Sequence, residues 1–192
     1  MRVKAVSAKS IIAFCLGFAV FSSTYTKAQE VSVKEAIQNL VATVCSKGSV
    51  TLTAEQKLLM ADWLRVNGEA VKNVHPSEFK GEGPAMANPK VPYTWRDIRF
   101  AESKNALYMF MMDVPQDDMK IKELCTRVGG RIIGKVKLLG SDERMSWEME
   151  AHELSLEKPR ILPKDGVTVF KITWTDYYKE LPADKSIKIL NP

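Results

Sequence analysis

The stretch Val167–Trp174, with the sequence VTVFKITW, carries the pattern that decides the class of fold. Phe170, Ile172 and Trp174 are spaced two residues apart, so in an extended chain their side chains point to the same face. A turn-forming stretch, Pro163–Gly166, comes directly before it. A period of two after a turn predicts a β-strand that buries one face.

Six stretches upstream of Val167 show the same pattern. Clusters rich in Gly, Pro, Asn, Asp and Ser separate them, and no helical pattern lies between them. A parallel sheet would need crossover helices, so the sequence predicts a mainly β fold, an antiparallel two-sheet β-sandwich preceded by two α-helices. The predicted strands are Trp95–Phe100, Ala106–Val114, Met119–Leu124, Arg131–Leu139, Met145–Met149, His152–Leu156 and Val167–Trp174.

The two predicted helices each begin at a capping box. Ser32–Glu35 precedes apolar residues at helical spacing, and Gly48 ends that helix. Thr53–Gln56 precedes a second apolar stripe, which ends at Asn67-Gly68. We therefore expect a helical segment over 29–68, a connecting loop over 69–94, and a β-sandwich domain with a C-terminal tail over 95–192.

Residues 1–28 have the pattern of a secretory signal peptide. Three cations precede the apolar stretch Ile11–Phe21, and the small residues Thr26 and Ala28 flank Lys27 at an expected cleavage site. This apolar stretch is shorter than the roughly 20 residues that a membrane span needs. We therefore expect a secreted or periplasmic chain cleaved after Ala28, with no membrane anchor after cleavage.

The net charge of +5 over 192 residues comes mostly from this leader. Residues 1–28 hold four of the 28 Lys and Arg residues and no acid, which leaves 24 cations against 23 acids. A nearly neutral chain lacks the broad positive field of nucleic-acid-binding proteins, so no nucleic-acid partner is expected.

Two cysteines, Cys45 and Cys125, follow the expected cleavage site. A disulfide between them would close a long loop and add roughly 3–5 kcal/mol of stability. The alternative is a pair of buried free thiols, since Cys is among the most frequently buried residues. Both alternatives stay open at the level of sequence.

A search for catalytic motifs identifies no catalytic residue, metal site or cofactor site. His75 and His152 lie outside any zinc-binding spacing, and Gly81–Pro84 is better explained as a turn than as a phosphate-binding loop. Glu148 and Glu150 lie about 6.6 Å apart on one strand face, near the separation used by inverting glycosidases. Because Met145, Trp147 and Met149 occupy the opposite face, we expect both acids to face water.

Exposed aromatic residues are the candidates for binding a carbohydrate, because sugar rings pack well on aromatic faces. Trp147 and Trp174 are in phase with buried positions and are assigned to the core. Four aromatic residues lie at strand margins, where exposure is expected: Tyr93, Trp95, Tyr177 and Tyr178.

Several segments resemble the α-L-fucosidases of glycoside hydrolase family 29. Residues 40–48 and 55–70, the latter ending in DWLRVNGEA, resemble the stretch around the last helix of that family's catalytic barrel and its exit. Residues 81–84 (GEGP), 97–100 (DIRF) and 105–108 (NALY) resemble the entry to its C-terminal β-sandwich, and residues 136–141 with Trp147 resemble later strands. The similarity covers roughly residues 36–174, but residues 49–52 and 73–79 depart from the family pattern.

This resemblance implies a fucosidase C-terminal region without its barrel. A (β/α)₈ barrel takes about 250 residues, whereas 164 residues follow Ala28. The family's nucleophilic aspartate and acid/base glutamate lie on that barrel, so neither is transferred to this chain.

Three functions follow as hypotheses. The first is an exported, non-catalytic accessory or carbohydrate-associated module, with a fucosylated glycan as its expected ligand. The second is an interaction subunit of a barrel-bearing glycosidase chain, in which Val44, Leu59, Trp63 or Val66 would lie in an exposed apolar patch. The third is an enzyme, a truncated α-L-fucosidase-type glycoside hydrolase that uses Glu148 and Glu150.

Overall fold

The structure, a computed structural model, describes residues 33–125, 131–163 and 166–175. Its helical part precedes the sheets, as predicted. The helices are the N-terminal helix over residues 33–47, α2 (Ala54–Leu59), α3 (Ala61–Asn67), the 3-10 helix η1 (Gly68–Ala70) and the short α4 (Pro84–Ala87). In the described residues no helix is both long enough and apolar enough to cross a membrane.

The second predicted helix is observed as two shorter ones. The capping box at its start is confirmed, because Gln56 donates its backbone N–H to Thr53 Oγ1 at 3.2 Å and accepts from the Thr53 N–H at 3.0 Å. At Met60 the backbone leaves helical geometry and the chain turns before α3 begins. This turn buries the Met60 side chain in the core. The first capping residue, Ser32, lies outside the described residues.

Two antiparallel sheets are present, and all seven predicted strands contribute to them. The larger sheet has the order β1-β2-β3-β8-β5 and the smaller one the order β4-β7-β6. The two-residue β1 and the helix α4 lie within the stretch predicted as a connecting loop. The strands are β1 (His75–Pro76), β2 (Ile98–Glu102), β3 (Leu107–Met111), β4 (Met119–Ile121), β5 (Ile132–Leu138), β6 (Trp147–Met149), β7 (Leu154–Leu156) and β8 (Thr168–Thr175).

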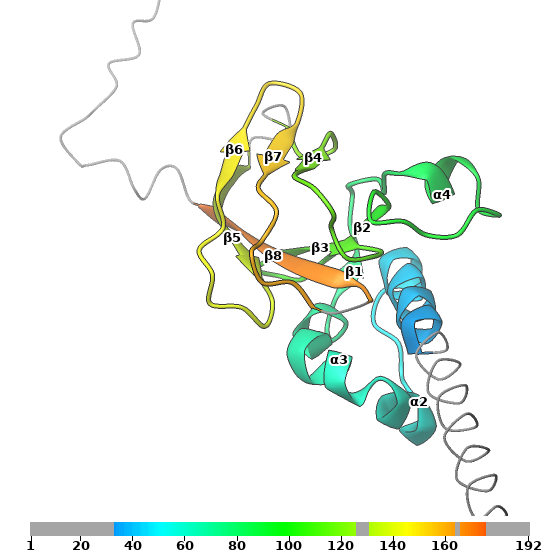
Figure 1. Ribbon diagram of the computed structural model, residues 1–192. Helices are drawn as coiled ribbons and strands as arrows, with labels where there is room; N and C mark the ends of the chain where they lie inside the picture. Colours follow the sequence, from blue (N-terminus) through cyan, green and yellow to red (C-terminus); the bar gives the residue numbers. More distant parts are fainter. Residues whose placement is uncertain (1–32, 126–130, 164–165, 176–192) are drawn as a thin grey trace, which may run out of the picture.

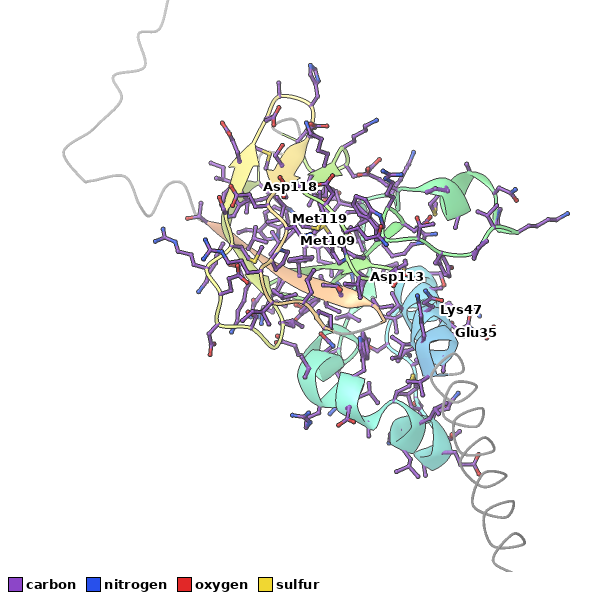
Figure 2. The ribbon with its side chains drawn as sticks, viewed as in Figure 1. Glu35, Lys47, Met109, Asp113, Asp118 and Met119 are labelled. Atoms are coloured by element: carbon purple, nitrogen blue, oxygen red, sulfur yellow. The ribbon has the colours of Figure 1, made fainter. Side chains whose placement is uncertain are left out.

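The space between the two sheets is filled by the first of two hydrophobic cores. Met109 of β3 and Met119 of β4 belong to this inter-sheet core, as do Phe170 and Ile172 of β8 (Figure 2). Trp174 is partly buried and packs against it. The predicted two-sheet sandwich is therefore confirmed.

The other face of the larger sheet carries the second, helix-side core. Tyr108 and Phe110 of β3 point toward it, and Val41 and Val44 of the N-terminal helix pack there with no exposed surface. Figure 1 shows the N-terminal helix, α2 and α3 on one side of the larger sheet and β4, β6 and β7 on the other. The molecule therefore has three layers, and its central sheet is buried on both faces.

Candidate functional site

Tyr93 and Trp95 lie in the loop between α4 and β2, and both are half-buried. Tyr93 packs against the helix-side core and has the Arg99 guanidinium 5.3 Å from its ring centroid. Trp95 packs against the inter-sheet core, with the Arg96 guanidinium at 4.9 Å. The two rings thus contact different cores and do not form one joint platform. Tyr177 and Tyr178 lie outside the described residues.

The segment Gly81–Pro84, predicted as a turn, is a bend that leads into a helix and is held against Asp97: Glu82 forms an isolated antiparallel bridge with Ile98, and Pro84 begins α4. Gly83 has a φ of +104°, and a Cβ atom there would lie 2.5 Å from the Arg96 carbonyl oxygen. Glycine is therefore required for both backbone conformation and close approach. The bend at Gly83 therefore packs directly against residues 96 and 97 at the start of the DIRF segment.

Asp97 is fully buried, and hydrogen bonds satisfy both of its oxygens. Oδ1 accepts from the backbone N–H of Ala85 at 2.7 Å, which caps α4. Oδ2 accepts from the backbone N–H and the hydroxyl of Thr94 at 2.8 and 2.9 Å. A buried carboxylate with this many donors has a structural role, because no lone pair faces solvent or a hollow.

A second pair of acids, Glu82 and Glu123, joins the same turn to the segment after β4. Glu82 accepts from the Glu123 backbone N–H at 2.8 Å, and Glu123 accepts from the Lys80 N–H at 3.2 Å. Burial raises the pKa of Glu82, and the nearby Glu123 charge adds to the rise, whereas the hydrogen bond from the Glu123 N–H opposes it. Both carboxylates bind backbone groups, so their position supports a structural role.

Glu148 and Glu150 face solvent, as predicted. Both side chains are exposed, and Glu150 accepts a hydrogen bond from the Ser155 hydroxyl at 2.6 Å. On the opposite strand face, Trp147 and Met149 pack against the inter-sheet core. His75 and His152 are exposed too, and among the described residues no group of three His, Cys, Asp or Glu side chains could hold a metal ion.

Cys45 and Cys125 are free thiols in the structure, so the disulfide alternative is not realised in it. Cys45 packs on the helix side of the larger sheet, whereas Leu124, the neighbour of Cys125, lies in the inter-sheet core. Burial raises the pKa of Cys45 to about 12, although the positive charge of Arg99 lowers it in part. A thiol with this pKa stays protonated at neutral pH and is a poor nucleophile.

The expected exposed patch on the helical segment is not formed by the four residues predicted for it. Val44 is fully buried, and Leu59 and Trp63 pack against the helix-side core. Trp63 also donates its Nε1–H to the Val167 carbonyl at 2.8 Å. Of the four, Val66 is classed as exposed, at 37%. The apolar stripe of these helices covers the chain's own sheet.

The hollows on the surface that are large enough to hold a ligand include two grooves of similar size. The helical groove, of about 980 Å³, lies between residues 50–52 and the segment formed by α2, α3 and residues 68–72. The β5 groove, of about 890 Å³, lies between β5 residues 134–137 and the segment 141–147. Both volumes fall within the usual range of about 300–1,000 Å³ for ligand sites. The β5 groove brings three cations, Lys135, Lys137 and Arg144, together with the aromatic ring of Trp147, so it is the candidate binding site.

The sequence analysis did not identify this groove. Trp147 was assigned wholly to the core, and it does pack there while also lining the groove. The relevant signal is that β5 lies at the edge of the sheet, which depends on strand order. Strand order is not apparent from the alternation of side chains.

Similar folds occur in solved α-L-fucosidases. The similarity to α-L-fucosidase isoenzyme 1 of Paenibacillus thiaminolyticus has 18% identity and a TM-score of 0.51, and covers 75% of this chain and 35% of that one. The Thermotoga maritima α-fucosidase, solved with a mechanism-based inhibitor, is 22% identical, with a TM-score of 0.51. That similarity covers 73% of this chain and 34% of the fucosidase. A family 29 α-L-fucosidase of Bacteroides thetaiotaomicron is 18% identical, with a TM-score of 0.50. That similarity covers 75% of this chain and 32% of the fucosidase.

The chain therefore spans about a third of the length of the fucosidases that it matches. At these identities the similarity establishes a shared fold, and it confirms the predicted resemblance at that level. No protein-family model matches the chain, and no curated protein matches it.

Proposed function

We propose that this protein is an exported, non-catalytic module that associates with carbohydrate. The observation that carries the proposal is the fold, which corresponds to about a third of each matched α-L-fucosidase. A shared fold does not by itself transfer activity, so the acids in the described residues must be considered separately.

The positions of these acids support a role without catalysis. A glycosidase needs two carboxyl groups that flank the bond to be cleaved, one of them desolvated so that it can act as an acid. Asp97 is desolvated but accepts three hydrogen bonds from Thr94 and Ala85. Glu148 and Glu150 are exposed, and a strand face turned to water does not enclose a sugar.

The test combines hydrolysis with binding. The purified chain is incubated with 4-nitrophenyl α-L-fucoside, and its binding to 2′-fucosyllactose, lactose, dextran and dextran sulfate is followed by titration calorimetry. We expect no release of nitrophenol and measurable binding to at least one carbohydrate. Hydrolysis that is lost in Glu148→Gln or Glu150→Gln would instead establish a glycosidase, and the absence of binding to every carbohydrate would refute the association.

A second candidate function, an interaction subunit of a barrel-bearing glycosidase, is favoured by the surface of α2. This helix has no buried residue, its Leu58 is 80% exposed, and its Lys57 lines the helical groove. If a glycosidase chain binds there, tagged protein recovered from its native host will carry α-L-fucosidase activity, and Leu58→Glu will remove that activity from the eluate. An eluate without activity would exclude this function.

Export rests on the pattern of residues 1–28, which lie outside the described residues. We propose cleavage after Ala28, so protein recovered from the producing cells should begin at Gln29. N-terminal sequencing checks this directly, and a mature chain that still begins at Met1 would contradict it.

A further inference from the structure

The β5 groove is open because β5 is an edge strand. In the order β1-β2-β3-β8-β5, β5 pairs with β8 on one side, and its other side has no neighbouring strand in the described residues. The chain leaves β5, turns at Gly140, and returns along the groove before it enters β6. One wall is thus a sheet edge and the other is the segment 141–146.

Hydrogen bonds hold that second wall in place. The Glu143 carboxylate accepts from the backbone N–H groups of Arg160 at 3.1 Å and Ile161 at 3.4 Å, and the Glu143 N–H donates to Ser141 Oγ at 3.1 Å. The Met145 side chain is buried in the inter-sheet core. The groove is therefore largely preformed, which lowers the entropy cost of binding a ligand.

The charges that line the groove are mostly positive. Lys135, Lys137 and Arg144 line it with exposed side chains, and none of the three has an ion-pair partner among the described residues. Two acids, Asp142 and Glu143, also line it, so three cations stand against two acids, and the Glu143 carboxylate is held in the wall by backbone N–H groups. Three unpaired cations around one hollow complement an anionic ligand.

Trp147 adds an aromatic surface to these cations. It begins β6, packs against the inter-sheet core, and is still partly exposed where it lines the groove. Packing against the core restrains the ring, so it can stack on a ligand with little further loss of freedom. The combination suits a sugar ring with an acidic substituent, since the ring meets Trp147 and the substituent meets a cation.

We propose that the β5 groove binds an acidic polysaccharide, a chain of sugar rings that carry carboxylate or sulfate groups. The proposal rests on the carbohydrate-associated function proposed above and names its ligand class and site. A nucleic acid is disfavoured because the 24 Lys and Arg residues after position 28 are balanced by 23 acids, so the chain lacks a broad positive field beyond the three cations of the groove.

The test uses probes matched in sugar but not in charge. Calorimetric titration of the full chain with dextran sulfate, polygalacturonate and neutral dextran should show binding to the two polyanions and not to dextran. Binding should weaken with added salt, because exposed charges are screened. The triple variant Lys135→Gln, Lys137→Gln, Arg144→Gln should bind dextran sulfate roughly ten-fold more weakly, as expected for three exposed charge contacts.

A second triple variant is the matched control. Lys47→Gln, Lys90→Gln, Lys104→Gln removes the same charge from exposed lysines without ion pairs in the described residues. Its affinity should stay within about two-fold of the parent, because the net charge matters little for a local site. Trp147→Ala should weaken binding without changing the salt dependence. Equal circular dichroism of both triple variants checks that both fold.

Three results would overturn the proposal. The first is an equal loss of affinity in both triple variants, and the second is equal affinity for dextran and dextran sulfate. The third is equally tight binding of a 20-base-pair DNA duplex. Binding of dextran or 2′-fucosyllactose without binding of either polyanion refutes this inference and leaves the proposed function standing. Absence of binding to every carbohydrate refutes both.

Discussion

At the scale of single residues, Asp97 is the side chain on which the turn at Gly81–Pro84 most depends. It has no exposed surface and accepts three hydrogen bonds. We expect Asp97→Ala to lower the free energy of unfolding by about 3 kcal/mol or more, because it leaves buried donors without an acceptor. Urea denaturation measures this. Asp142→Ala, at an exposed site, is the control and should change stability by less than about 0.5 kcal/mol. Equal effects would contradict the assigned role.

Cys45 predicts a specific dependence of stability on pH. Its pKa is raised from 9.0 to about 12 by burial, so the unfolded chain loses this proton at a lower pH than the folded one. At a pH between the pKa of the unfolded chain and that of the folded chain, unfolding releases the Cys45 proton. The free energy of unfolding therefore falls as the pH rises through this range. Below the pKa of the unfolded chain, Cys45 is protonated in both the folded and the unfolded state. It then contributes nothing to the change of stability with pH.

The measurement compares the parent chain with Cys45→Ala by urea denaturation between about pH 8 and pH 11. The parent should lose stability faster, by up to about 1.4 kcal/mol per pH unit, which is the contribution of one proton. Tyr108 and Lys171 also have raised pKa values, from burial and from the hydrogen bond to Glu69 respectively. Tyr108 and Lys171 are present in the parent chain and in Cys45→Ala alike, so their contributions to the pH dependence cancel in the comparison. Identical slopes would show that Cys45 is not buried.

At the scale of elements, the N-terminal helix and α2 differ in how they pack. Leu40 of the former is 6% exposed in the helix-side core, whereas Leu58 of α2 is 80% exposed. Leu40→Ala should therefore lower the free energy of unfolding by about 2–4 kcal/mol, because it leaves a cavity. Leu58→Ala should change it by less than about 0.5 kcal/mol. Chemical denaturation measures the free energy of unfolding of both variants. A large loss of stability in Leu58→Ala would contradict the exposed position of α2.

The strands also show how far alternation predicts structure. β8 carries apolar residues at every second position from Phe170 to Trp174, whereas in β5 a β-bulge between Ile133 and Lys135 interrupts the alternation; both strands form where the sequence predicts them. β3 is buried at all five positions, because helices cover one of its faces and the smaller sheet covers the other. Local pattern identifies such a stretch as a strand. It does not reveal the third layer, which depends on how distant helices pack.

At the scale of the whole molecule, the sequence predicts the fold class better than it predicts the candidate site. The sandwich, the helices before it and the exposure of Glu148 and Glu150 are confirmed. The β5 groove was not predicted, because it needs β5 at a sheet edge and the segment 141–146 folded back along it. Lys135 and Lys137 are unremarkable in the sequence, where charges on a strand face usually meet water.

The segment Gly81–Pro84 was predicted only in part, because the chain bends at Gly83 as expected but begins the helix α4 at Pro84. Gly83 acts through its own backbone conformation, which residue type constrains strongly, whereas the Asp97 carboxylate reaches the N–H of Ala85, twelve positions earlier in the chain. Ligand sites depend instead on side chains that come from several elements, here β5, β6 and the segment between them. Strand order determines which of these side chains meet, and the sequence pattern does not specify strand order.

One measurement tests the central claim, that this chain associates with carbohydrate and does not cleave it. The purified protein is mixed with a fucosylated, partly sulfated polysaccharide, and affinity electrophoresis and released fucose are measured in the same sample. We predict that the polysaccharide retards the protein and that fucose does not rise above the level of a protein-free blank. Release of fucose in proportion to added protein, or migration unchanged by the polysaccharide, would contradict the account.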